Sequence, residues 1–150
     1  MAYHLSMKLP DVDPNRIPML KADYEQHVRT PMLALLDRLH EAKLFRLLLP
    51  RSNDGVETDP VTFFHVIETI SRGDASTAWC LSQAGGCAMT AAYLDPKVAH
   101  EIFGKANSVL AWGPGKARAV ETDGGYKVTG TWAFASGGRH ATWLGCHAPI

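Results

Sequence analysis

The sequence lacks an excess of charge of either sign. Its 15 Lys and Arg residues balance its 15 Asp and Glu residues, so the formal net charge is zero and the pI is about 7.0. Binding to nucleic acid or to an anionic membrane surface typically shows as a basic excess. The composition therefore indicates neither partner.

Cysteine is scarce, and the sequence has no metal-ligand spacing. The three cysteines, Cys80, Cys87 and Cys146, are odd in number and match no metal-binding motif. Reduced, mostly buried thiols are the default for such a set. Neither a disulfide framework nor a metal site is expected.

A long apolar run and a targeting signal are also missing. The longest stretch without a charged residue, 75–94, includes serine, threonine, glutamine and glycine, and is too polar for a membrane span. It is better interpreted as a buried helix, alanine-rich and apolar nearly all round. The N-terminus shows no basic-then-apolar pattern, so we expect a cytoplasmic protein.

What the sequence does contain is a series of helix starts. Thr30-Pro31, Asp59-Pro60 and Asp95-Pro96 each combine an N-cap residue with a proline in the first turn. Ser76 is a candidate cap for the helix between the last two, and Asp74 is a further capping residue. The predicted helices cover 19–28, 30–43, 60–73, 76–94 and 96–103. Phe63, Phe64, Ile67 and Ile70 mark one buried face.

The spacing of apolar residues changes from a helical to a strand pattern after residue 105. Segments 117–120 and 126–134 flank Asp123-Gly124-Gly125, a strong hairpin signal, and 108–112 and 142–147 are further strand candidates. Tyr126 to Phe134 place alternate residues on one face. The order predicts an α+β protein, with a helical domain over 1–105 and part of an antiparallel, β-barrel-like domain over 106–150.

The segment 130–143 carries the clearest chemical signal. An aromatic residue, a hydroxyl and two glycines lie between two apolar runs, as a strand needs if its backbone and one ring are to lie against a flat conjugated ligand. This pattern favours a flavin, with contacts from Phe134 and Ser136. The alternative is an ordinary strand end with a core aromatic and a Ser-Gly turn.

Three segments carry a family resemblance: 44–50, 73–79 and 124–137. In this order and at these separations they resemble the acyl-CoA dehydrogenase superfamily. The closer match is its branch of two-component flavin-dependent monooxygenases, which 124–137 matches nearly residue for residue.

The resemblance implies a helical domain, a β-barrel-like domain and a C-terminal four-helix bundle, usually in a homotetramer that binds FAD or FMN. It places Trp112 and Gly113 along the pyrimidine edge of the flavin and Phe134 against its isoalloxazine ring. Ser136 stands where dehydrogenases have a threonine near flavin N5, and Ala135 lies between these contacts.

By the same resemblance, Trp79 and position 87 face the substrate pocket; a core role for Trp79 and small-residue packing for Cys87 are the alternatives. His140, next to Arg139, is a further pocket candidate, or satisfies a turn carbonyl. Many of the hydroxylases have a histidine where this chain has Cys87. A thiol is not an equivalent proton donor, so the departure counts against phenolic substrates.

The family pattern predicts a monooxygenase that uses O2 and reduced flavin, supplied by a separate reductase, on a small aromatic substrate. An acyl-CoA dehydrogenase is the alternative. Family members are much longer than 150 residues, and the bundle and catalytic residues are expected beyond this chain. Alone, it is expected to be inactive, and a non-catalytic truncated fragment is the rival from another class.

Overall fold

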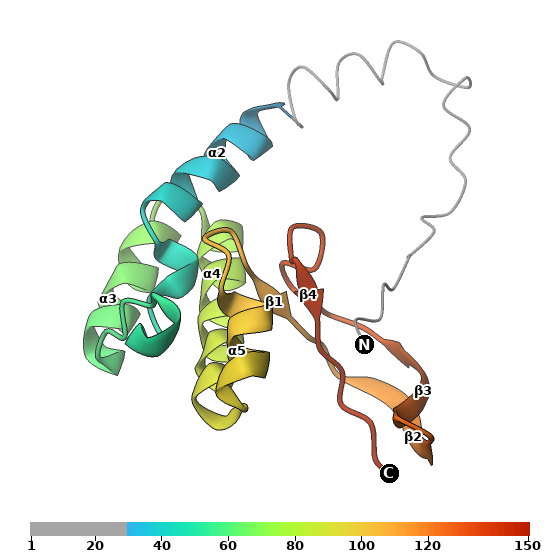
Figure 1. Cartoon of the computed structure of the whole chain (residues 1–150). Coiled ribbons are helices and arrows are strands. Elements are labelled where there is room, and N and C mark those ends of the chain that lie inside the picture. Colours follow the sequence, from blue (N-terminus) through green and yellow to red (C-terminus); the bar gives the residue numbers. More distant parts are fainter. Residues whose placement is uncertain (1–29) are drawn as a thin grey trace, which may run out of the picture. The chain divides into compact units, whose positions relative to one another are not determined.

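The computed structural model describes residues 30–150, so the helix predicted over 19–28 lies outside the described residues. The chain divides into two units, 1–38 and 39–150, and the second contains all the packing described below. Its helices and strands are shown in Figure 1. In chain order the elements are α2 (Thr30–Glu41), α3 (Pro60–Ser71), α4 (Ala75–Ala88), α5 (Pro96–Phe103), β1 (Leu110–Ala111), β2 (Gly115–Thr122), β3 (Gly125–Trp132) and β4 (Trp143–Leu144).

The helix starts follow the sequence pattern, with one change. The Asp59 carboxylate accepts hydrogen bonds from the backbone N–H groups of Val61 and Thr62, both at 3.0 Å. Asp95 caps α5 in the same way. The cap of α4 is Asp74 rather than Ser76, which lies inside the helix and donates its backbone N–H to that carboxylate at 3.0 Å. Free N–H groups at the starts of α3, α4 and α5 are thereby satisfied.

One face of α4 is buried and the other is exposed, contrary to the expectation of a helix that is apolar nearly all round. Apart from Leu81 its buried residues are small, and α3 packs closely against it. A β-carbon on Gly85 would lie 2.8 Å from the ring of Phe63. Phe64 follows Phe63 by 100° around α3, so it cannot face α4 as well, and it is 65% exposed. Its predicted place on the buried face is wrong, and Phe63, Ile67 and Ile70 on that face are half-buried.

The helix α4 also ends earlier than expected, at Ala88 rather than near Leu94. The chain continues as a 3-10 helix over Met89–Tyr93, and the Thr90 hydroxyl donates to the carbonyl of Cys87 at 2.7 Å. The hydrophobic core that includes Ala91 of this 3-10 helix joins the helices to β1. Its members are Leu49, Cys87, Ala88, Ala91, Ala99, Phe103 and Leu110. None of the helices within residues 30–150 has the length and hydrophobicity needed to cross a bilayer.

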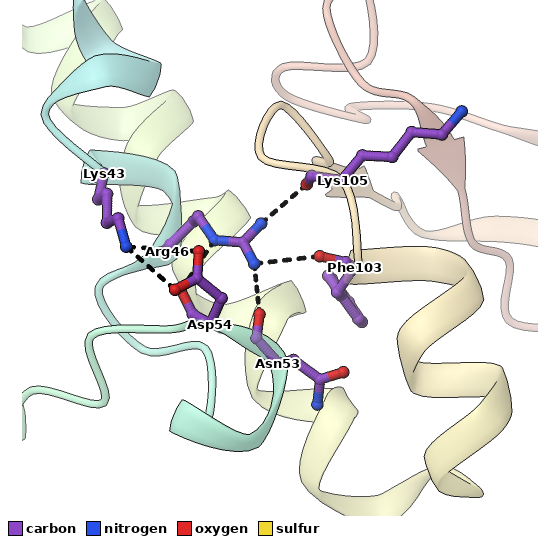
Figure 2. A network of polar contacts seen from close by, with 6 residues as sticks. All are labelled: Lys43, Arg46, Asn53, Asp54, Phe103 and Lys105. Carbon is purple, nitrogen blue, oxygen red and sulfur yellow. Dashed lines mark hydrogen bonds and ion pairs between the residues drawn. The ribbon is translucent and has the colours of Figure 1, made fainter.

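A buried arginine fastens the end of α5 to the loop before α3. Arg46 is 2% exposed, and Figure 2 shows its guanidinium between two backbone segments. It donates to the carbonyls of Phe103 at 3.1 Å, Lys105 at 3.0 Å and Asp54 at 3.2 Å, and also to that of Asn53. Burial lowers its pKa, and the charge of Asp54 opposes that shift. The planar donor set of arginine suits such a cluster of acceptors.

The strands β2 and β3 form the predicted antiparallel hairpin. Thr122 pairs with Gly125 across the two-residue turn Asp123–Gly124, and Gly124 has a φ of 82°, which favours glycine. Beyond β4 the chain returns to the open edge of β2, where the Ala119 N–H donates to the Pro149 carbonyl at 2.9 Å. This edge of the hairpin is therefore partly covered.

The short strands β1 and β4 are parallel, which corrects the expectation of antiparallel pairing throughout. Leu110 pairs with Trp143 and Ala111 with Leu144. A parallel pair requires a long connection, and the β2–β3 hairpin supplies it. Thr142 extends the contact, because its hydroxyl accepts from the Val109 N–H at 3.0 Å. Each sheet within residues 30–150 has two strands and neither closes, so the α+β class is confirmed without a barrel.

Candidate functional site

Two segments proposed to contact a cofactor meet where β1 leads into β2. The Ala133 N–H donates to the Pro114 carbonyl at 2.9 Å. A β-carbon on Gly113 would lie 2.0 Å from the Ala133 oxygen and 2.9 Å from the Ala135 nitrogen. Glycine is therefore required at position 113 for this backbone approach. The structure thus brings together Gly113 and Ala135, two of the residues predicted to contact the cofactor.

Phe134 leaves the strand instead of continuing it. β3 ends at Trp132, and Phe134 has a φ of 54°, in the left-handed region. The predicted alternation along one face therefore stops before Phe134. A non-glycine residue in this region is strained by about 1 kcal/mol or more. With the backbone in this conformation, the Phe134 side chain is 86% exposed.

An open hollow of about 400 Å³ lies between these segments and α4. Its volume is in the usual range for small-molecule sites. The rings of Trp112 and His147 meet edge-to-face inside it, with centroids 5.7 Å apart. It is lined by Gln83, Trp112, Gly113, Pro114, Gly115, Phe134 and His147. Three of the five predicted cofactor residues, Trp112, Gly113 and Phe134, are among them.

Ser136 is joined to Trp79, across 57 positions of sequence. The indole Nε1–H donates to the Ser136 hydroxyl oxygen at 2.9 Å. Trp79 is 59% exposed, so it is not the core residue that its apolar helix suggested. The structure places it beside the Phe134–Ser136 loop, on the face of α4 that also carries Gln83.

Cys87 lies in the core and does not line the hollow. It is 4% exposed and packs with Leu49, Phe103 and Leu110. Burial raises the pKa of its thiol, while a backbone hydrogen bond from Trp112 opposes that shift. A protonated, enclosed thiol is a poor nucleophile. The placement favours the packing interpretation over a pocket role.

His140 also lies away from the hollow. Its ring is half-buried against Phe45, with ring centroids 5.4 Å apart. The Phe45 ring also contacts the ring of His40, at a centroid distance of 4.7 Å. Burial lowers the pKa of His140, and the positive charge of a protonated His40 lowers it further. The placement favours a packing contact of the 137–141 loop with Phe45 over a place for His140 in the hollow.

Four lining residues were not predicted: Pro114 and Gly115, which directly follow Gly113, and Gln83 and His147. Gln83 follows Trp79 by four residues, so helical spacing alone places both on one face of α4. His147 had no such signal. It reaches the hollow because the chain folds back past β4, where its carbonyl accepts from the Trp132 indole at 3.1 Å.

No protein-family model matches the chain, but individual known proteins are similar to it in sequence. The oxygenase subunit HsaA of a flavin-dependent monooxygenase from Rhodococcus jostii is 33% identical over 115 residues, 75% of this chain and 30% of the relative. The indole-3-acetate monooxygenase of Pseudomonas putida is 30% identical over 125 residues, 82% of this chain and 31% of the relative.

A solved structure gives the same result. The 3-HSA hydroxylase from Rhodococcus sp. RHA1 superposes with a TM-score of 0.73 at 27% identity, over 89% of this chain and 37% of that one. Over the matched region the chain is similar to flavin-dependent monooxygenases, which supports its resemblance to the acyl-CoA dehydrogenase-like monooxygenase branch. It spans about a third of the length of the relatives it matches. The family resemblance predicted from the sequence is thereby confirmed.

Proposed function

We propose that this chain forms one wall of the flavin site of a monooxygenase that uses reduced flavin and O2 to hydroxylate a small aromatic substrate. The relatives that it matches are named as flavin-dependent monooxygenases, an indole-3-acetate monooxygenase and hydroxylases, rather than dehydrogenases. Within this chain, the meeting of Gly113 with the Phe134–Ser136 loop around one hollow carries the proposal.

The residues of the hollow fit a flat conjugated ring. Phe134 exposes most of its ring, and the absence of a side chain at Gly113 lets the two backbone segments meet beside it. A planar ligand gains most from this combination, because aromatic stacking needs an accessible face. The Ser136 hydroxyl and the Gln83 amide add polar groups at the margin. FAD and FMN share the ring that this surface would hold, and both remain candidates.

When bound, the flavin would supply the redox chemistry, by passing electrons to O2 and activating it for insertion into the substrate. The chain would supply binding and orientation. In this proposal, Phe134 and Trp112 pack against the ring system, the backbone near Gly113 and Ala135 lines its edge, and Ser136 hydrogen-bonds to it. Trp79 belongs to the adjoining substrate side, whereas Cys87 and His140 have structural roles.

The remaining parts of the site are proposed to lie outside these 150 residues. The hollow is open, and the relatives are about three times longer than the matched region. A four-helix bundle that closes the site, a catalytic residue on it and a homotetramer are part of this proposal. A separate reductase would supply reduced flavin in the cytoplasm, as the name oxygenase subunit of the HsaA relative suggests.

The proposal is tested by titrating the chain with oxidised FMN and FAD while following the Trp112 indole resonance by NMR, which detects weak binding. We expect a saturable shift, with no turnover by the chain alone. Phe134→Ala should weaken binding about tenfold, since a stacked aromatic contributes about 1 kcal/mol or more. Phe64→Ala is the matched control, because Phe64 is similarly exposed on α3. Equal binding by both variants would contradict the proposal.

A further inference from the structure

The contact between Trp79 and Ser136 joins α4 to the loop after β3. The indole nitrogen and the hydroxyl oxygen are 2.9 Å apart, the usual length of an N–H···O hydrogen bond. Because the residues are 57 positions apart, the contact is tertiary. It lies beside Phe134, one of the residues that line the hollow.

Burial does not explain a tryptophan at position 79. The side chain is 59% exposed, so it contributes little to the core, where α4 places small residues and Leu81 instead. Its indole N–H is a polar group, and such groups usually find a hydrogen-bond partner. The interaction that the structure gives Trp79 is its hydrogen bond to Ser136.

The direction of this hydrogen bond fixes the polarity of Ser136. An indole N–H can only donate, so the serine oxygen must accept. The hydroxyl proton of Ser136 is then left to point away from Trp79 and is available to a second acceptor. Without Trp79 the same hydroxyl would rotate freely between donor and acceptor roles.

The backbone around Ser136 is already constrained. Its N–H donates to the Phe134 carbonyl at 2.8 Å, and Gly138 donates to the Ala135 carbonyl at 2.9 Å. Phe134 and Gly137 both have positive φ angles, of 54° and 81°. The loop is therefore a tight turn with a defined shape. Its backbone contacts leave the Ser136 hydroxyl free to rotate, and the hydrogen bond from Trp79 restricts that rotation.

We propose that Trp79 is a positioning residue, which holds the Ser136 hydroxyl so that its proton faces an acceptor atom of the flat ligand stacked on Phe134. This inference rests on the proposed flavin site. Trp79 acts on that ligand through Ser136, so its substitution should have no effect once the hydroxyl is absent.

The contact itself is tested without any ligand. In the 150-residue chain, the indole N–H resonance of Trp79, assigned with Trp79→Phe, should shift in Ser136→Ala. Its exchange with solvent should accelerate about fivefold, as expected for the loss of an ordinary hydrogen bond. Ser136→Thr restores the hydroxyl and should restore slow exchange. Ser71→Ala, which removes an exposed serine at the end of α3, is the control. An unchanged indole resonance in Ser136→Ala would overturn the inference.

The effect on the ligand is tested with oxidised FMN and a double-mutant cycle. Trp79→Phe and Ser136→Ala should each weaken FMN binding about fivefold, and the double variant should bind as Ser136→Ala does. Additive losses would show that Trp79 contacts the ligand directly, and would overturn its role through Ser136. If the wild-type chain binds neither FMN nor FAD while the indole contact is intact, the proposed function fails. The ligand-directed part of this inference fails with it, and Trp79 then only fastens the loop.

Discussion

Gly113 and Ala133 lie so close that a β-carbon on the glycine would overlap the alanine carbonyl oxygen, at 2.0 Å. This approach brings the bend before β2 against the end of β3, and the hollow lies over the junction. The geometry of the candidate site therefore depends on the absence of one side chain.

Gly113→Ala should separate the two segments. The added methyl group meets backbone atoms, which cannot rotate away, so the free energy of unfolding should fall by about 2 kcal/mol, typical of overpacking. Urea denaturation measures the loss, and FMN should no longer shift the Trp112 indole resonance.

Gly86→Ala is the matched control for this substitution. A β-carbon there would meet no atom within 4 Å, and Gly86 lies within α4. Alanine should therefore stabilise the helix by up to about 1 kcal/mol. A loss of stability in both variants would show that the close contact at Gly113 is not the cause.

Arg46→Met should be among the more destabilising single substitutions in the helical part. It leaves the carbonyls of Asn53, Asp54 and Phe103 without their donor, whereas that of Lys105 keeps the Ser108 N–H. Buried unsatisfied groups are costly, so a loss of about 3 kcal/mol is expected in urea denaturation. Lys43→Met is the control, since it removes only the exposed ion pair with Asp54, worth less than about 1 kcal/mol. Equal effects of the two variants would contradict a specific role of the guanidinium.

The helix starts were predictable because their signals are local. Asp59 and Asp95 bond to backbone N–H groups within three residues, so a short stretch of sequence contains the whole interaction. The hairpin turn at Asp123–Gly124 is local in the same sense. Where two local signals compete, as Asp74 and Ser76 do, the pattern predicts a helix start without deciding which residue caps it.

The remaining features depend on contacts between distant residues. Arg46 reaches Phe103 over 57 positions, and β1 pairs with β4 across the whole hairpin. Apolar runs predict strands but not their direction. The candidate site combines both cases. The sequence of segment 130–137 was enough to identify Phe134 and Ser136 as candidates. The exposure of the Phe134 ring and the hydrogen bond between Ser136 and Trp79 could be seen only in the folded structure.

The thiols should differ in reactivity according to burial. Cys146 is exposed and Cys87 is buried, and burial raises the pKa of the Cys87 thiol, so less of it is thiolate. With iodoacetamide at neutral pH, Cys87 should react about a hundredfold more slowly than Cys146, since it requires opening of the core. Mass spectrometry of the alkylated peptides gives both rates. In urea the difference should vanish; a fast reaction of Cys87 in the native chain would place it on a pocket surface after all.

Stability should fall as the pH drops below about 6.5, the ordinary pKa of histidine, in part through His140. Its pKa is lowered in the folded state by burial and then by His40, so the unfolded chain binds the proton more readily. The stabilisation is complete above the unfolded pKa and is lost as the pH falls toward the folded one. His140→Gln, which cannot titrate, should flatten this part of the pH profile of urea denaturation. His140→Phe, which likewise cannot titrate, is the second variant and should flatten the profile in the same way. If both variants keep the wild-type slope, the loop anchored on Phe45 does not respond to protonation of His140.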